Sequence, residues 1–147
     1  MNNRKRKVYV ASSWRNDLQQ KVVGILRSEG HEVYDFKNPS PGDRGFHWYE
    51  IDPLWKGWSV QDFVKALKHP LAQAGFKKDY SAMFWADCCV MVMPCGRSAH
   101  IEAGYFIGVR KTVIILAMQD VEPELMYLLA SKVCTTMPDV LTTLQKM

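Results

Sequence analysis

Residues 8–36, VYVASSWRNDLQQKVVGILRSEGHEVYDF, decide the fold. Residues 8–11 form a short apolar run that is typical of a buried strand. Residues 17–28 place apolar side chains at helical spacing, and Gly30 follows at the position where a glycine commonly ends a helix. Residues 31–36 then predict a second strand. The order strand, helix, strand with short connections favours a right-handed βαβ unit and therefore a parallel sheet.

The remainder of the chain continues this alternation. Further strands are predicted at residues 88–93, 112–117 and 133–136, and helices at residues 60–68, 78–86, 99–109 and 122–131 and from Pro138 onward. The pattern predicts a three-layer α/β domain, flavodoxin-like or Rossmann-like, with about five parallel strands. We assign residues 1–7 to a basic N-terminal tail and residues 8–147 to a single domain. The tryptophan-rich loop of residues 37–58 is long enough to predict a functional role.

Composition excludes several classes of function. The chain has 147 residues, 48% of them apolar, and a net charge of +4 that is concentrated in residues 4–7. Such a short basic run is typical of a solvated tail, so no nucleic acid polymer is expected as a partner. No apolar run approaches the ~20 residues of a bilayer span, so no membrane contact is expected. Four cysteines without CxxC spacing indicate free thiols and a cytoplasmic protein, and no metal or other cofactor is expected.

The candidate site lies in loops that follow strands. In open parallel sheets, ligands bind at the carboxyl ends of the strands, where residues 12–16, 37–58 and 94–98 are expected. In the third loop, we expect Gly96 to adopt an unusual backbone angle and Ser98 to cap the next helix. The first amides of that helix, together with the charge of Arg97, would bind an anion or a sugar oxygen.

Glu102 follows one turn later. A carboxylate near a helix N-terminus is favoured in its ionised form, which a nucleophile requires. Ala103 and Gly104 beside it are small and would let a ligand approach. On spacing alone, the leading interpretation of Glu102 is a first-turn charge on an exposed face. Asp79 alone is interpreted as an ordinary helix carboxylate, and His100 as a helix-surface or packing residue.

Four segments together resemble the nucleoside 2-deoxyribosyltransferase superfamily, which includes nucleoside 5'-monophosphate N-glycosidases. They span most of the chain. The segments are Val8-Tyr9-Val10-Ala11-Ser12-Ser13-Trp14-Arg15, Lys78-Asp79-Tyr80 followed by Ala86-Asp87-Cys88-Cys89-Val90, Gly96-Arg97-Ser98 leading to Glu102-Ala103-Gly104, and Glu124-Leu125-Met126.

The resemblance implies a chemistry. Glu102 would attack C1' of a nucleoside and form a glycosyl-enzyme, which water or another base releases, as in retaining glycosidases. Asp79 would protonate the base or orient Glu102. The substrate would contact Tyr9, Ser13, Arg15, Gly96, Arg97, Ser98 and Met126. Trp48 would either stack on the base or pack within its loop. The family also implies a homo-oligomer, in which the segment around Met126 reaches the neighbouring subunit's site.

The sequence departs from the family pattern at one point. Transferases usually carry another acid shortly before the nucleophile, where this chain has Cys95-Gly96-Arg97-Ser98. Arg97 and Arg15 would suit a 5'-phosphate instead. Two alternatives stay open. One is a TIR-like NAD glycohydrolase, which shares a related layout and also uses a glutamate. The other is a nucleotide-sensing or scaffold module that binds its ligand without turnover.

Overall fold

A five-stranded parallel sheet is the centre of the fold in the computed structural model, which describes residues 4–147. The strands are β1 (Lys7–Ala11), β2 (Glu32–Asp35), β3 (Cys88–Val92), β4 (Thr112–Leu116) and β5 (Lys132–Cys134). Their spatial order is β2-β1-β3-β4-β5, and every neighbouring pair is parallel. This is the flavodoxin-like order, and it confirms the predicted fold class. The strand order reverses between β1 and β3, where such folds bind ligands.

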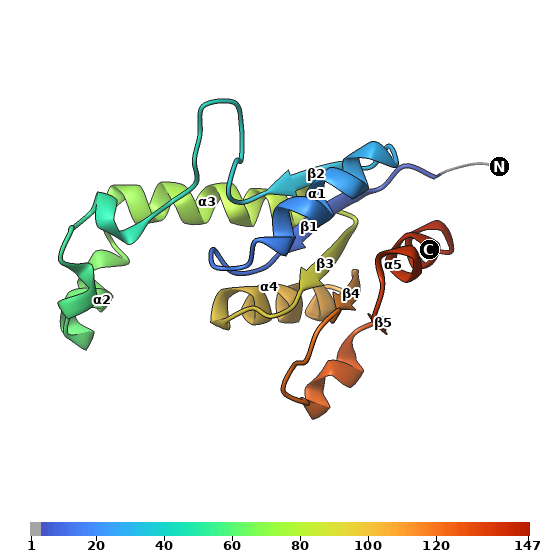
Figure 1. Cartoon of the computed structure of the whole chain (residues 1–147). Coiled ribbons are helices and arrows are strands. Elements are labelled where there is room, and N and C mark those ends of the chain that lie inside the picture. Colours follow the sequence, from blue (N-terminus) through green and yellow to red (C-terminus); the bar gives the residue numbers. More distant parts are fainter. Residues whose placement is uncertain (1–3) are drawn as a thin grey trace. The chain divides into compact units, whose positions relative to one another are not determined.

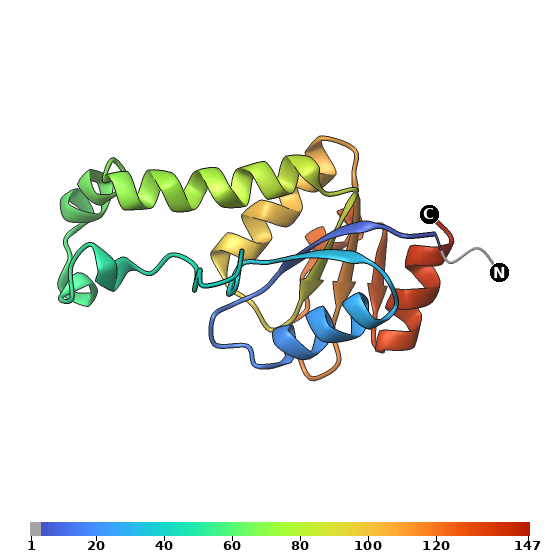
Figure 2. The same cartoon turned by 90° about the horizontal axis from the view of Figure 1, so that it is seen from above.

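Helices cover both faces of this sheet (Figures 1 and 2). The helices α1 (Leu18–Ser28) and α5 (Met137–Gln145) pack on one face, and α4 (Arg97–Gly108) packs on the other. Because successive side chains of a strand point to opposite faces, each strand contributes side chains to both helical layers. On the α1 and α5 side lies a fully apolar cluster formed by Val8, Val10, Val22, Val23, Leu26, Cys88, Val90, Val92, Ile114, Leu116, Cys134, Val140 and Leu144.

Two helices differ from their predictions. The α3 helix is Pro70–Trp85 and begins eight residues before the predicted start at residue 78, because proline is well tolerated in the first turn of a helix. The predicted helix at residues 122–131 is instead the short 3-10 helix η3 (Leu125–Leu129). Only five residues of this stretch are helical, and four of them expose large apolar side chains, so no buried face holds a longer α-helix there.

The described chain divides into two compact units, one comprising residues up to Asp35 together with Trp85–Met147, and the other Phe36–Phe84. The sheet belongs to the first unit. The second unit contains the 3-10 helices η1 (Trp48–Glu50) and η2 (Trp55–Gly57), the helix α2 (Val60–Ala66) and most of α3. The loop that the sequence predicted at residues 37–58 is therefore partly structured.

An aromatic cluster organises the second unit. The ring of Trp48 packs edge-on against Phe46, Trp58 and Phe63, with centroid distances of 4.8, 5.8 and 6.1 Å. Gly75 on α3 lies against Phe46, where a Cβ atom would come within 2.8 Å of the Phe46 Cβ. This close approach explains a glycine inside a helix, where it otherwise costs ~1 kcal/mol.

Arg6 has partners in the fold, whereas Arg4, Lys5 and Lys7 of the basic segment are exposed. The Arg6 guanidinium donates to the carbonyl oxygens of Leu144, at 3.3 Å, and Met147, while the Arg6 amide donates to His31 Nδ1 at 3.2 Å. Arg6 thus ties the start of β1 to the C-terminal helix. No helix among residues 4–147 is both long and apolar enough to cross a bilayer.

Candidate active site

The central contact of the candidate site joins Tyr9 on β1 to Glu102 on α4. Tyr9 is fully buried, and its hydroxyl donates to Glu102 Oε2. Its ring is held between Tyr34, stacked at a centroid distance of 5.3 Å, and Phe106, tilted at 5.5 Å. The strand alternation that sends Val8 and Val10 toward α1 sends Tyr9 toward α4. A rigid phenol therefore presents one donor to the predicted nucleophile.

The ionisation of Glu102 differs from the prediction. The α4 helix begins at Arg97, so Glu102 is its sixth residue and lies beyond the first turn, where the helix dipole acts. Glu102 is half-buried, and burial raises the pKa of its carboxyl group to about 8. The cost of desolvating the carboxylate therefore outweighs the stabilisation that the sequence analysis expected from the helix N-terminus. The carboxyl group is only partly ionised at neutral pH.

The loop before α4 corrects two further predictions. Gly96 is the N-cap residue of α4, with φ −99° and ψ −152°, a conformation that any residue can adopt. Ser98 lies inside the first turn and does not cap the helix. The side chains of Arg97 and Ser98 are exposed, and within the described residues neither makes a hydrogen bond. They and the first α4 amides are accessible to a ligand.

Two buried polar residues after β1 escaped the sequence analysis. The Ser12 hydroxyl donates to the Val92 carbonyl oxygen at 2.8 Å. Asn16 Nδ2 donates to the carbonyl oxygens of Val92, at 3.3 Å, and Pro94, at 3.1 Å. These bonds fasten the turn after β1 to the loop after β3 at the reversal of strand order. A polar residue directly after a buried strand is the signal that would have indicated them.

The predicted ligand contacts in the same turn are a half-buried residue, Ser13, and an exposed one, Arg15. Ser13 Oγ accepts from the Arg15 amide at 3.3 Å, and the Arg15 side chain points into solvent without a hydrogen bond to any described residue. The turn is therefore held by Ser12 and Asn16, and it presents Ser13 and Arg15 at the carboxyl end of β1. Contact of this turn with a ligand stays a prediction.

His100 and Tyr127 form a second pair that the sequence did not predict. His100 Nδ1 lies 2.7 Å from the Gly96 carbonyl oxygen, and Nε2 lies 2.8 Å from the Tyr127 hydroxyl. The two rings stack with a centroid distance of 5.7 Å. His100 therefore connects the loop before α4 to η3. A histidine two residues before Glu102 gives no sequence signal for this contact, because its partner is 27 positions away.

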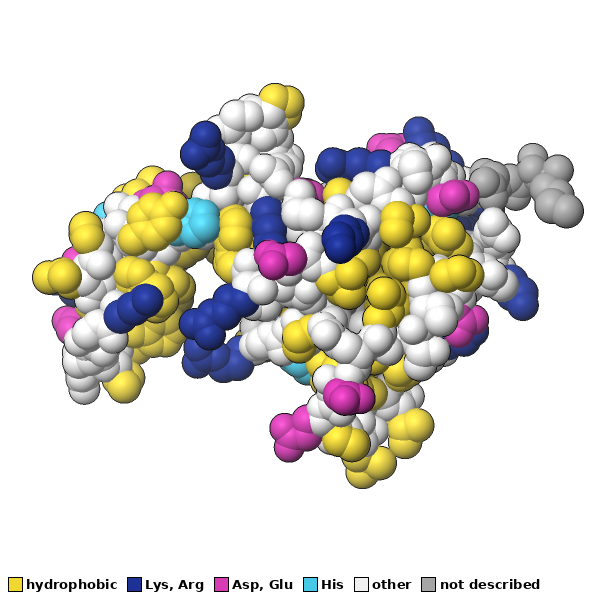
Figure 3. Space-filling model, in the orientation of Figure 1, with side chains coloured by type: hydrophobic (Ala, Val, Ile, Leu, Met, Phe, Trp, Pro, Cys, Tyr) yellow, Lys and Arg dark blue, Asp and Glu magenta, His cyan; other side chains and the backbone are white. Residues whose placement is uncertain are grey.

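The η3 segment exposes most of its apolar side chains. Exposed fractions are 74% for Leu125, 58% for Met126, 83% for Leu128 and 56% for Leu129. In Figure 3 these hydrophobic side chains gather at the lower edge of the face shown. The Met126 amide donates to Glu124 Oε1 at 3.0 Å, which fixes the start of the turn. We call these four side chains the η3 apolar patch.

Asp79 and Trp48 belong to the second unit. Asp79 is half-buried on α3, and Trp48 is part of the aromatic cluster. Packing is thus the role that the structure gives Trp48. Contact of either residue with a substrate stays a prediction. Asp87, by contrast, lies in the first unit and has a structural role, since its Oδ2 accepts from the Lys7 amide at 2.9 Å.

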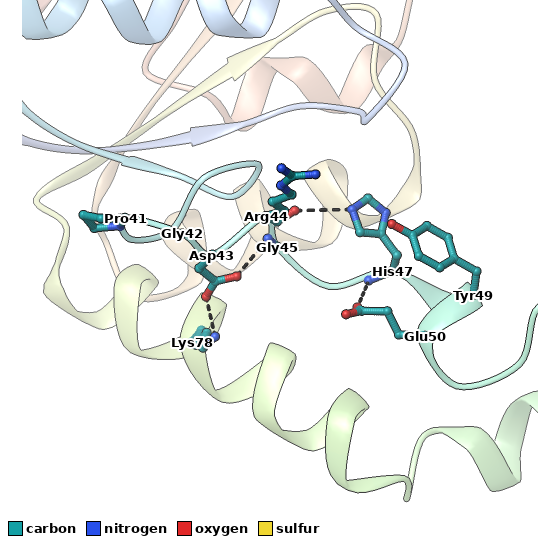
Figure 4. Close-up of a pocket in the computed structure, with 9 residues that line it drawn as sticks. All are labelled: Pro41, Gly42, Asp43, Arg44, Gly45, His47, Tyr49, Glu50 and Lys78. Atoms are coloured by element: carbon teal, nitrogen blue, oxygen red, sulfur yellow. Dashed lines mark hydrogen bonds and ion pairs between the residues drawn. The ribbon is translucent and has the colours of Figure 1, made fainter.

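The second unit also holds an open, polar pocket of about 610 Å³ (Figure 4). Asp43 forms an ion pair with Lys78, and its Oδ1 accepts from the Gly45 amide at 2.9 Å. The Lys78 hydrogen bond is the main cause that lowers the pKa of Asp43. The pocket is lined by Pro41, Gly42, Asp43, Arg44, Gly45, His47, Tyr49, Glu50 and Lys78. None of the predicted site residues is among them.

Thiols and possible metal ligands are dispersed. The four cysteines are free, and burial raises the pKa of Cys88 to about 12 and of Cys95 to about 11. Both thiols therefore stay protonated and unreactive at neutral pH. Across residues 4–147, no three His, Cys, Asp or Glu side chains come together in a group that could hold a metal ion.

Comparisons with known proteins agree with this architecture. The fold is that of a flavodoxin-like α/β protein, and the candidate site lies beside the β1–β3 reversal. Among solved structures, the chain is similar to a 2-deoxyribosyltransferase from the psychrotolerant bacterium Bacillus psychrosaccharolyticus. The TM-score is 0.64 at 19% identity, over 93% of this chain and 94% of the other. No known protein family and no curated protein matches the sequence. The likeness confirms the predicted fold.

Proposed function

We propose that the protein cleaves the N-glycosidic bond of a nucleoside or nucleoside 5'-monophosphate, with Glu102 as nucleophile. The observation that carries this proposal is the buried Tyr9 hydroxyl donating to a half-buried carboxylate beside the β1–β3 reversal. A buried donor that contacts one carboxylate serves to position it and to stabilise its anion. The similar solved structure, a 2-deoxyribosyltransferase described as a biocatalyst for nucleoside synthesis, supports the same class of reaction.

The proposed reaction has two displacement steps. A Glu102 carboxylate oxygen bonds to C1' as the C1'–N bond breaks. The electron pair of the C1'–N bond leaves with the base, and the base takes up a proton. Water, or the nitrogen of an incoming base, then bonds to C1', loses a proton and displaces the carboxylate. Asp79 is proposed to protonate the leaving base or to orient Glu102. Tyr9 acts as a positioning residue through its hydrogen bond to Glu102.

The charge of the substrate loops favours a 5'-phosphate. Arg97 and Ser98 lie exposed at the start of α4, and Ser13 and Arg15 lie in the turn after β1. Two guanidinium groups and the first amides of a helix provide strong donors for a phosphate. Gly96 and Met126 are proposed to contact the sugar and base, and contact of Trp48 with the base is a further proposal. With Arg97 in place of an acid, we infer hydrolysis over exchange between free bases.

A binding module without turnover is the second candidate function. The observation that favours it is the raised pKa of Glu102, because a carboxyl group that is mostly protonated at pH 7 is a poor nucleophile. Under this alternative the wild type binds nucleotides but releases no base, and Glu102→Gln binds them equally well.

A substrate panel tests the proposal. The protein is incubated at pH 7 and pH 9 with deoxy- and ribonucleosides, their 5'-monophosphates and NAD, with and without a second base, and released base is separated by chromatography. Free base without an acceptor indicates hydrolysis, and a new nucleoside indicates transfer. We expect Glu102→Gln to lower kcat about 1,000-fold. Glu122→Gln, at an exposed carboxylate, is the matched control. Full activity of Glu102→Gln would show that the proposed nucleophile is wrong.

A further inference from the structure

The His100 ring is held on both sides by groups whose hydrogen-bonding roles can be assigned. The Gly96 carbonyl oxygen, 2.7 Å from Nδ1, can only accept, so Nδ1 carries the proton. In the neutral ring, Nε2 is then the acceptor, and the Tyr127 hydroxyl donates to it over 2.8 Å. Burial raises the pKa of Tyr127, so this hydroxyl keeps its proton. The Tyr127 hydroxyl also contacts the weakly accepting Met93 Sδ, at 3.8 Å.

The bond to Gly96 determines where an amide of the substrate loop points. The Gly96 carbonyl and the Arg97 N–H belong to the same peptide plane and point in opposite directions. Fixing the carbonyl oxygen therefore fixes the direction of the Arg97 amide. The backbone bond from the His100 amide to this oxygen is long, at 3.4 Å, and Gly96 supplies no side-chain cap. The His100 ring therefore makes the shorter hydrogen bond to this oxygen.

Tyr127 completes the arrangement from the other side. Its hydroxyl and ring hold the imidazole, with ring centroids 5.7 Å apart and an interplanar angle of 25°. Because Tyr127 is the middle residue of η3, the same contact places Met126 relative to the start of α4. One side-chain pair thus joins η3 to the loop that the proposed function assigns to phosphate binding.

We propose that His100, oriented by Tyr127, is a positioning residue that aims the Arg97 amide at the substrate's phosphate. This inference rests on the proposed function for its substrate. It assigns His100 no contact with the reacting atoms, because Glu102 and Tyr9 form a separate hydrogen bond. Loss of the pair therefore weakens binding of phosphorylated substrates and leaves the displacement at C1' intact.

Three variants test the pair in the full-length chain. His100→Leu removes both ring hydrogen bonds, and Tyr127→Phe removes one. His100→Asn restores the first, because the Asn side-chain nitrogen occupies the place of Nδ1. We expect His100→Leu to raise KM for a nucleoside 5'-monophosphate about tenfold, with kcat within about twofold and no change for the unphosphorylated nucleoside. His100→Asn should recover most of this loss. Tyr127→Phe should add little in the His100→Leu background, since neighbouring partners are non-additive.

Tyr49→Phe, in the second unit, is the matched control for loss of a tyrosine hydroxyl. An equal loss of kcat for both substrates, or an unchanged KM for both, would overturn the proposal.

A second readout separates this inference from the proposed function. Inorganic phosphate is titrated into ¹⁵N-labelled protein, while the Arg97 amide and the His100 ring nitrogens are followed by NMR. We expect the proton on Nδ1 and a phosphate-dependent shift of the Arg97 amide that is lost in His100→Leu. A wild type that releases no base from any substrate refutes the proposed function alone. A proton on Nε2, no phosphate response in the wild type, or the same response in the variant refutes the positioning role.

Discussion

Glu102 is subject to two opposing influences on its ionisation. Burial raises the pKa of the carboxyl group to about 8, whereas the Tyr9 hydroxyl donates a hydrogen bond that stabilises the anion. The attacking species is the carboxylate. We therefore expect kcat/KM to rise with pH and to reach half of its plateau near pH 8. Initial rates in a constant-ionic-strength buffer series measure this profile. A plateau reached already at pH 6 would contradict the assigned environment of Glu102.

The same shift predicts how Glu102 affects stability. The folded state keeps the Glu102 proton up to about pH 8, whereas the unfolded chain loses it near 4.5. Because the folded state binds more protons between these values, its stability falls as pH rises through this window. Glu102→Gln, which cannot ionise, should therefore melt higher than the wild type at pH 9 and by a smaller margin at pH 4.5. Thermal unfolding at both pH values tests this, and a pH-independent difference would count against it.

Tyr9→Phe isolates the hydroxyl at the centre of the site. The ring contacts with Tyr34 and Phe106 remain, so the free energy of unfolding should change by no more than about 1 kcal/mol. Loss of the charge-assisted bond should lower kcat about 10- to 100-fold. The pH profile should also move to higher pH, because the anion loses a donor. Rates from pH 6 to pH 10 measure both effects, and an unchanged profile would separate Tyr9 from Glu102 functionally.

At the scale of single residues, the sequence indicated which residues are candidates for the site. It did not indicate the environment in which each of them lies. Glu102 could be singled out because it follows a strand, a loop and a helix start. Its pKa could not, since burial depends on Tyr9 and on the packing of α4 against β1. His100 was interpreted as a packing residue for the same reason, because Tyr127 becomes its neighbour only in the folded chain.

Among the elements, regular periodicity was predictable and irregular segments were not. The β1-α1-β2 unit follows the expected pattern, including Gly30 with φ +90° at the end of α1. The start of α3 was missed at Pro70. In a sequence, a proline is equally compatible with the end of one helix and the first turn of the next. The extent of η3 was missed because its apolar residues suggest a buried helix, while the structure exposes them.

The fastening of the β1 turn to the β3 loop gives a prediction at the element scale. Asn16→Ala removes two hydrogen bonds, to the carbonyl oxygens of Val92 and Pro94, while Val92 keeps its bond from the Ser12 hydroxyl. We expect a loss of about 1–3 kcal/mol in the free energy of unfolding, measured by urea denaturation. Ser13→Ala, at a more exposed position in the same turn, should cost far less. Equal effects of the two variants would show that the fastening is unimportant.

At the scale of the whole molecule, the first unit contains the sheet, Glu102, Tyr9 and the proposed substrate loops before α4 and after β1. The second unit, Phe36–Phe84, contains Asp79 and Trp48 and has its own aromatic cluster. The sequence indicated both sets of residues, and the assignment of residues 8–147 to a single domain stays a prediction. The aromatic packing of residues 46–63 lies within the second unit, and it has no regular period for a sequence pattern to detect.

The η3 apolar patch is the surface through which we expect copies of the chain to associate. Four apolar side chains more than half exposed within five residues are unusual on a monomer and typical of an interface. We expect light scattering to give a dimer or a larger assembly, with Met126 of one copy close to the site of the next. Leu128→Glu, at a side chain 83% exposed, should dissociate the assembly at little cost in folding stability and lower activity about tenfold or more. Ile25→Glu, on α1, is the matched control and should remain assembled. A fully active monomeric wild type would show that the site is complete within one chain.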